Sequence, residues 1–114
     1  MEQEFTRADD LTQDQPLKFN SLLAERIGLN EAIVIQQFYS WCEYYGEIKD
    51  EHKWIRKGYN ELNERFPFWS INTLKRTICS LQESEYLISK RYNSSKFDNT
   101  KWYRVNVEKL LMTI

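Results

Sequence analysis

A proline between two amphipathic segments is the feature that most restricts how this chain can fold. Pro67 lacks a backbone N–H and disfavours helical geometry in the residue before it, so a helix that begins near Gly58 must end at Phe66. Ser70 is then placed to cap a second helix over residues 71–84. Two helices joined by a turn of about three residues are typical of a helix-turn-helix.

The helix after this turn has one apolar and one polar face. At 100° per residue, four apolar residues lie within about 80° of one another and are predicted to face the core. These residues are Ile71, Leu74, Ile78 and Leu81. The polar residues opposite them are Asn72, Thr73, Arg76, Ser80 and Glu83, with Lys75 on the flank.

The polar face suits the major groove of duplex DNA. An arginine such as Arg76 can reach guanine O6 and N7, and an asparagine such as Asn72 can pair with adenine N6 and N7. The N–H groups at the start of the helix can hold a phosphate, which predicts a contact over Ser70, Ile71 and Asn72. The alternative is an ordinary solvated helix face, because these residue types are common on surfaces.

Two further helices are predicted before this pair. Asn20 or Ser21 caps the first, which ends at Gly28, and Asn30 caps the second, which ends at Gly46. The second helix has one narrow polar stripe and is otherwise apolar or aromatic, so it is either the central helix of the core or part of a subunit interface. The stripe consists of Gln36, Ser40, Glu43 and Glu47.

The remaining pattern predicts a charged loop, a small sheet and a closing helical turn. Period-two alternation in residues 101–107 is typical of a half-buried strand. The predicted segments are a loop over 47–53 that contains His52, a short strand over 54–56, a hairpin of 86–92 with 101–107 around a polar turn, and a helical turn over 108–112. The element order predicts an α+β, mostly α, winged helix-turn-helix with a small antiparallel wing sheet, in which the strand at Trp54 is the third strand.

The predicted hairpin is basic. A wing of this kind lies against the phosphate backbone or in the minor groove, and Lys96 at the loop tip is the best candidate for a backbone contact. The alternative role for the same side chains is to protect a sheet edge from aggregation. Trp102 is expected to pack beneath an Arg or Lys stem rather than to stack on a base. The basic residues are Lys90, Arg91, Lys96, Lys101 and Arg104.

Charge is divided unevenly along a chain whose net charge is −1. Residues 1–52 carry four basic and eleven acidic side chains, whereas residues 53–104 carry eleven basic and five acidic ones. The basic half is therefore a candidate surface for a polyanion, although solvated charges also cluster by chance. Residues 1–15 are polar and acidic and are predicted to form a flexible arm before a single domain over 16–114.

The residue types that commonly carry catalysis do not form a pattern that predicts an enzyme. His52 is the single histidine and has no nucleophile to serve, and the three glycines are isolated, so no phosphate-binding glycine loop is predicted. Cys42 and Cys79 are too few for a disulfide scaffold or a four-cysteine zinc site, and they are typical of helix-borne thiols in a reducing cytoplasm. We therefore expect no catalytic residue, no metal and no cofactor. Neither a signal peptide nor a membrane-spanning run is visible.

Four segments together resemble replication proteins from phages and plasmids of Gram-positive bacteria. The run GLNEAIVIQQ is similar to the opening of that family, and FPFWS followed by TLKR is similar to its helix-turn-helix. Trp54 before a tyrosine-bearing helix and DNTKWY in the wing strand add to the resemblance, which covers residues 17 to 111. Many relatives have a glycine after the recognition helix, where this chain has Ser84-Glu85-Tyr86, and relatives are often longer.

The resemblance implies a winged-helix domain related to the N-terminal domains of DnaD-like proteins and phage replisome organisers. Such domains bind DNA or self-associate, and they help to assemble a replication complex at an origin. It places the recognition helix at residues 70–84 and suggests contacts from Asn72, Thr73, Lys75 and Arg76. The expected function is binding of double-stranded DNA in replication initiation. Open alternatives are a transcriptional regulator with this fold, or an oligomerisation module that forms a homodimer or larger oligomer through the N-terminal helices and binds DNA poorly.

Overall fold

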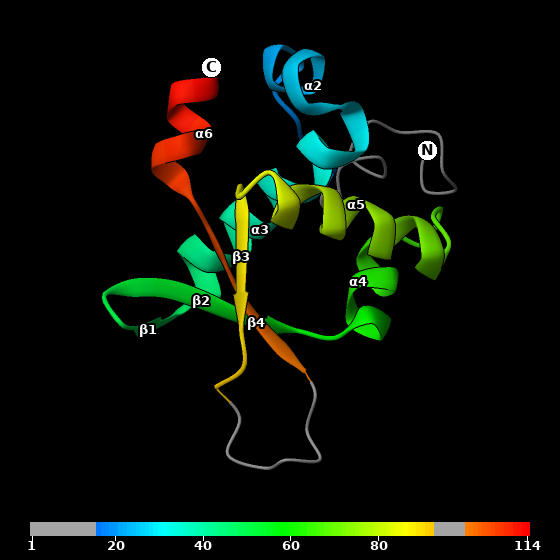
Figure 1. Ribbon diagram of the computed structural model, residues 1–114. Helices are drawn as coiled ribbons and strands as arrows, with labels where there is room; N and C mark the ends of the chain where they lie inside the picture. Colours follow the sequence, from blue (N-terminus) through cyan, green and yellow to red (C-terminus); the bar gives the residue numbers. More distant parts are fainter. Residues whose placement is uncertain (1–15, 93–99) are drawn as a thin grey trace, which may run out of the picture.

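Five helices and a four-stranded antiparallel sheet make up the part of the chain that the computed structural model describes, residues 16–92 and 100–114 (Figure 1). The predicted α+β class is confirmed. The predicted arm over 1–15 and most of the hairpin tip lie outside the described residues. The elements are α2 (Ser21–Ile27), α3 (Leu29–Tyr45), β1 (Glu47–Lys49), β2 (His52–Lys57), α4 (Tyr59–Arg65), α5 (Ile71–Glu83), β3 (Leu87–Lys90), β4 (Lys101–Val105) and α6 (Val107–Thr113).

A single glycine joins α2 to α3. Asn20 caps α2 as predicted, because its Oδ1 accepts the Leu23 N–H at 3.0 Å. Gly28 has φ of 110°, which a residue with a side chain rarely adopts, and its carbonyl accepts the Ala32 N–H at 2.9 Å. The prediction that Asn30 caps the second helix is therefore wrong, since the reversal at Gly28 lets α3 begin at the very next residue.

The predicted charged loop over 47–53 is also wrong, because β1 and β2 form a hairpin there. Asp50 and Glu51 are the two residues of its turn, and both have positive φ, at 50° and 67°. A type I′ turn needs this geometry and is recognised in sequences by pairs such as Asn-Gly or Asp-Gly, and the Asp-Glu pair lacks the glycine at the second position. The strand at Trp54 is consequently six residues long rather than three.

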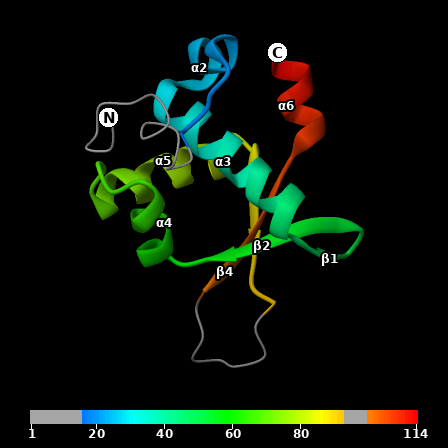
Figure 2. The same cartoon turned by 180° about the vertical axis from the view of Figure 1, so that it is seen from behind.

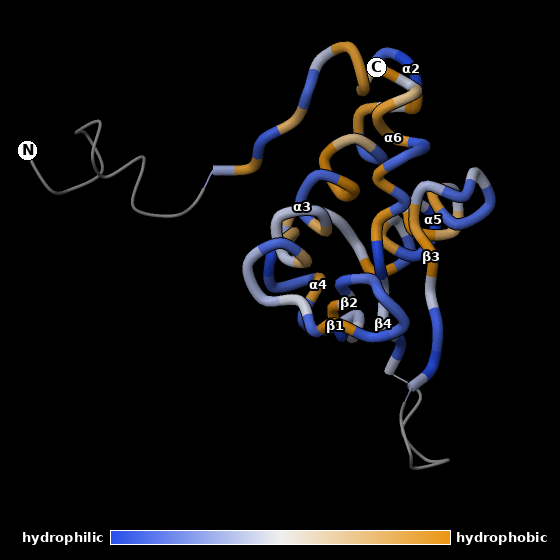
Figure 3. Tube along the Cα trace, turned by 90° about the vertical axis from the view of Figure 1, so that its left-hand side faces the viewer, coloured by the Kyte–Doolittle hydropathy of each residue, from blue (hydrophilic) through white to orange (hydrophobic). Residues whose placement is uncertain are grey.

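The sheet has the strand order β1-β2-β4-β3. The predicted hairpin is confirmed as β3 and β4, with Leu87 opposite Val105 and Ser89 opposite Tyr103. β2 pairs with β4 through Ile55 and Tyr103, so the strand at Trp54 is the third strand, and β1 extends the sheet to four. In Figure 3 the tube along β3 changes from hydrophobic to hydrophilic colours toward the point where the chain leaves the sheet.

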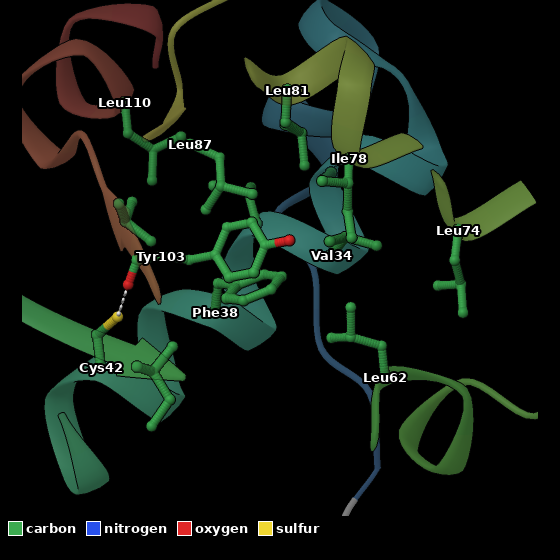
Figure 4. Packing of buried hydrophobic residues seen from close by; sticks show 14 of the residues in the cluster. Val34, Phe38, Cys42, Leu62, Leu74, Ile78, Leu81, Leu87, Tyr103 and Leu110 are labelled. Atoms are coloured by element: carbon green, nitrogen blue, oxygen red, sulfur yellow. Dashed lines mark hydrogen bonds between the residues drawn. The ribbon is translucent and has the colours of Figure 1, made fainter. Parts of the chain in front are cut away.

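The core lies where α3 meets both α5 and the sheet, and Figure 4 shows this packing. Phe38 of α3 is completely buried, and its ring lies 5.0 Å from that of Tyr103 and 5.3 Å from that of Trp41. The predicted apolar face of α5 is confirmed for Leu74, Ile78 and Leu81, all buried. The second helix is a core helix, since five of its residues are buried, and the alternative that it is also part of a subunit interface stays a prediction. No helix in the described ranges is long and apolar enough to cross a membrane.

α5 ends in a left-handed residue that is not glycine. Glu85 has φ of 64°, the Tyr86 N–H donates to the Leu81 carbonyl at 3.0 Å, and the Glu85 N–H donates to the Gln82 carbonyl at 3.0 Å. These are the two hydrogen bonds of a Schellman motif. The Nζ of Lys109 from α6 also donates to the Ser84 carbonyl, which places a cation at the negative end of α5.

This geometry predicts that Glu85→Gly stabilises the protein. Glycine adopts positive φ without a steric penalty, so we expect the free energy of unfolding to rise by about 0.5–1 kcal/mol in urea titrations. Glu85→Ala is the matched control, because it removes the same carboxylate and keeps the Cβ. Equal stability of the two variants would contradict the assigned strain.

Candidate nucleic-acid interface

The turn between α4 and α5 sets the direction of the second helix. Asn63 Nδ2 donates to two carbonyls, those of Phe66 at 3.1 Å and Trp69 at 2.9 Å, so one side chain holds both ends of the turn. Phe66 is fully buried, and its ring packs 5.3 Å from that of Trp69. The helix end at Phe66 and the cap at Ser70, both predicted from Pro67, are confirmed.

The first turn of α5 carries a connected row of polar side chains. Ser70 Oγ accepts the Thr73 N–H at 3.1 Å and donates to Thr73 Oγ1 at 3.1 Å. Arg76 Nη2 donates to the same Thr73 Oγ1 at 3.3 Å. Thr73 is half-buried, whereas Ser70, Asn72 and Arg76 are exposed. The structure therefore brings four of the predicted contact residues to one exposed helix end and holds three of them by hydrogen bonds.

Two other predicted residues of α5 lie at the edges of this face. Lys75 is exposed, and its Nζ sits 5.3 Å from the ring centroid of Tyr59 on α4, which directs its long side chain along the helix pair. Ser80 is half-buried and lines a cleft of about 400 Å³ between α5, α2 and α6, with Arg26 and Lys109 among the other lining residues. Ser80 thus faces the N-terminal helix rather than the sheet.

The basic residues of β3 and β4 occupy the hairpin beside α5. Lys90 and Arg91 are exposed, and Lys101 and Arg104 are half-buried. Arg104 lies over the Trp54 ring, with 5.7 Å between the guanidinium carbon and the ring centroid. Lys96 lies outside the described residues, so its predicted contact with the backbone stays a prediction.

α5 and the β3–β4 hairpin lie on the same side of the molecule. Figure 1 shows both in front of α3, and the reverse view in Figure 2 shows α3 in front of them. Gln82 Nε2 donates to Ser89 Oγ at 2.7 Å, which joins the end of α5 to β3 directly. This contact is at the C-terminal end of α5, so the polar N-terminal end and the basic strands share one side of the molecule but lie at opposite ends of the helix.

An aromatic layer lies under the cations of the sheet. The Tyr92 ring is 5.1 Å from that of Trp54 and 6.4 Å from that of Trp102. Lys49 Nζ lies 4.7 Å from the Trp102 ring centroid, and Trp102 is only 9% exposed. The expected contact between Trp102 and a cationic stem is confirmed, but the tryptophan is buried rather than outward, and the cation belongs to β1 rather than to the hairpin.

A cluster around Asp50 is what the sequence interpretation missed. The Tyr92 hydroxyl donates to Asp50 Oδ2, and Lys90 Nζ lies 3.5 Å from the same oxygen. The hydrogen bond from Tyr92 and the charge of Lys90 hold the pKa of Asp50 below its usual value, and the same carboxylate raises the pKa of Tyr92. Asp50 and Tyr92 are 42 residues apart, so no local pattern links them.

The two cysteines have different surroundings. Burial raises the pKa of Cys42 to about 11, and its Sγ donates to the Tyr103 carbonyl at 3.7 Å, so the thiol stays protonated in the core. Cys79 is exposed on α5. Among residues 16–92 and 100–114, no group of three or more His, Cys, Asp or Glu side chains is arranged to hold a metal ion.

No protein-family model, curated protein sequence or solved structure matches the chain. The resemblance to phage and plasmid replication proteins therefore stays a prediction that rests on the sequence motifs.

Proposed function

We propose that this protein is a winged helix-turn-helix domain that binds double-stranded DNA. The observation that carries the proposal is that α5, whose N-terminal half is polar and basic, lies on the same side of the fold as the basic β3–β4 hairpin. The sequence adds a charge argument, because eleven basic and five acidic residues lie between positions 53 and 104. A concentrated positive surface of this kind attracts the phosphate backbone.

In this proposal α5 enters the major groove. An α-helix with its side chains is about 10–12 Å wide, and the major groove of B-DNA is about 12 Å wide. Arg76 and Asn72 are exposed on the half of α5 that follows the turn, and they supply the donors that pair with guanine and adenine. Ser70 and the first N–H groups of α5 face a phosphate at the groove edge.

The hairpin then lies against the phosphates. Lys101 is directly opposite Lys57 in the ladder between β2 and β4. Lys57 Nζ lies 4.5 Å from the ring centroid of Trp41 on α3, so Lys101 is the cation of this pair that we expect to contact a phosphate. Lys90 at the end of β3, Arg91 directly after it and Arg104 on β4 add three more cations to the hairpin. This arrangement supports a backbone contact without sequence readout.

The test is a titration of a labelled random-sequence duplex by fluorescence anisotropy between about 50 and 200 mM salt. We expect the affinity of the parent to fall steeply with salt, because bound cations release counterions from the duplex. Lys96→Ala should lower the slope of log affinity against log salt by about 0.9, the contribution of one phosphate contact. A parent that does not bind at 50 mM salt contradicts the proposed function, and an unchanged slope contradicts the role of Lys96.

The proposed biological context is initiation of phage or plasmid replication, and it rests on the sequence resemblance. A transcriptional regulator with the same fold uses the same groove, so the bound sequence separates the two. Selection of binding sites from a random library, followed by comparison with the genome that encodes the chain, gives that sequence. Repeats at an origin support replication, and promoter sites support regulation.

A second candidate function is a protein-interaction module, and the outer side of α3 favours it. Tyr39, Tyr44 and Tyr45 of α3 are exposed, the last two at its C-terminal end, and Ile48 on β1 is 75% exposed and close to them in sequence. Exposed apolar side chains of this number are a common mark of a contact with another protein. Sedimentation velocity tests self-association: a monomer at tens of micromolar protein contradicts a homo-oligomer through the N-terminal helices.

A further inference from the structure

Two donor groups contact one carboxylate at the root of the β3–β4 hairpin. The Tyr92 hydroxyl and Lys90 Nζ both contact Asp50 Oδ2. Lys49 Nζ lies 5.4 Å from the Tyr92 ring centroid, and Lys90 Nζ lies 5.2 Å from it. The Asp50 carboxylate is thus held by the phenol of Tyr92 and the ammonium of Lys90, and the ammonium of Lys49 lies near the same ring.

The Asp50 carboxylate belongs to a different part of the sheet from the donors that contact it. Asp50 is in the turn between β1 and β2, whereas Lys90 and Tyr92 belong to the end of β3 and the residues after it. In the strand order β1-β2-β4-β3, β1 and β3 are the two edges, so the Asp50 contact closes across the outer face of the sheet. The turn holds Asp50 at φ of 50°, a conformation that costs energy for a residue with a side chain.

The cluster remains open to solvent. The side chains of Lys90 and Asp50 are 57% and 62% exposed, and that of Lys49, which also pairs with Glu47 at 3.8 Å, is 31% exposed. Exposed ion pairs are weak, so an anion from outside can replace the carboxylate at little cost. A phosphodiester oxygen accepts hydrogen bonds from the same ammonium and hydroxyl donors that Asp50 now occupies.

We propose that Lys90 and Tyr92 form a binding site for a backbone phosphate of duplex DNA, and that Asp50 occupies this site in the free protein. The inference rests on the proposed function and deepens it, because it adds Tyr92 to the contact surface and gives Asp50 a role there. Asp50 acts as an internal competitor that lowers affinity for DNA until a phosphate displaces it. The lowered pKa of Asp50 keeps this competitor charged at neutral pH.

The test compares two substitutions that remove the same charge from adjacent residues of one turn. Asp50→Asn removes the competing charge, and asparagine tolerates the positive φ of this position. Glu51→Gln removes one negative charge at the neighbouring residue, which has no contact in the cluster described above. In anisotropy titrations with a random-sequence duplex, we expect Asp50→Asn to bind about two- to fivefold tighter than Glu51→Gln, the range that one exposed ion pair supplies.

Adding Lys90→Gln to the parent and to Asp50→Asn tests whether Lys90 is the source of the gain in affinity. With Asp50 present, Lys90 is already neutralised, so Lys90→Gln should weaken binding only slightly. With Asp50→Asn, the same change should cancel the gain and reduce the salt slope by about 0.9. Circular dichroism melting of each variant checks that the fold is kept.

The outcomes separate this inference from the proposed function. If the parent binds duplex and Asp50→Asn binds no better than Glu51→Gln, the phosphate site is overturned and DNA binding stands. If Asp50→Asn gains affinity that Lys90→Gln does not cancel, the assigned donor set is wrong. If neither the parent nor Asp50→Asn binds duplex at 50 mM salt, both proposals fall.

Discussion

Replacing Arg76 with alanine is expected to weaken binding to duplex DNA more than any other single change on the surface. Arg76 is exposed on α5, and its guanidinium is oriented by the hydrogen bond to Thr73 Oγ1. A bidentate contact from arginine to guanine contributes about 1–3 kcal/mol, which corresponds to a loss of roughly 5- to 150-fold in affinity. The loss should be largest on the preferred sequence and small on a random one, as measured by anisotropy.

Lys53→Ala is the matched control for this prediction. It removes one positive charge from β2, but Lys53 Nζ lies 3.4 Å from Glu43 Oε1 on α3, away from the α5 face. If Arg76→Ala and Lys53→Ala lose the same affinity, only the total charge matters. The assignment of α5 as the helix that contacts bases would then be wrong.

Phe38→Ala is expected to have the largest effect on stability. Phe38 is completely buried, and it packs against the rings of Trp41 and Tyr103, so it joins α3 to the sheet. Truncation of a buried phenylalanine to alanine costs about 3–5 kcal/mol, because the transfer free energy is lost and a cavity remains. Urea unfolding followed by circular dichroism measures the change, and a variant that is unfolded without urea agrees with the prediction.

The neighbouring residue provides the control for Phe38. Tyr39 is an aromatic residue on the same helix, but 40% of it is exposed. A surface substitution of this kind usually changes stability by about 0.5 kcal/mol or less. Tyr39→Ala should therefore unfold at nearly the parent's urea concentration. Comparable losses for the two variants would contradict the assignment of α3 as the central core helix.

Local chemistry is sufficient to predict the helix boundaries around the turn. Pro67 cannot continue α4, and the Ser70 hydroxyl can replace a backbone acceptor for the first N–H groups of α5. The core face of α5 follows from helical periodicity alone, and Leu74, Ile78 and Leu81 are buried as that periodicity predicts. These features depend on residues within one or two helical turns, so they can be predicted from the sequence alone.

The errors occur where tertiary contacts override weak local signals. Asp50 and Glu51 do not resemble a type I′ turn, and their strained conformation is held by the pairing of β1 with β2 and by the contact with Tyr92. Glu85 adopts a left-handed conformation in which glycine is expected, and hydrogen bonds from α6 residues surround that helix end. Neither position carries a residue that favours its own geometry.

The residues of the candidate surface also fall into two groups, those that the sequence predicts and those that depend on tertiary contacts. The α5 residues and the cations of the hairpin follow from helix position and strand alternation, so they are predictable from the sequence. Asp50 and Tyr92 come together only because the folded sheet brings the β1–β2 turn to the residues after β3, and Asp50 belongs to a segment that the sequence pattern predicts as a loop. A pairing between segments 42 residues apart has no local signature.

The most direct test of the central claim is a nuclear magnetic resonance titration of the labelled protein with a duplex. At 13.9 kDa the chain gives one resolvable amide signal for most residues. We predict that the largest chemical-shift changes fall on residues 70–79 of α5 and on residues 88–92 and 101–104 of the hairpin. Changes confined to the α3 side around Tyr39, Tyr44 and Tyr45, or none at equimolar duplex in low salt, would contradict DNA binding through α5 and the hairpin.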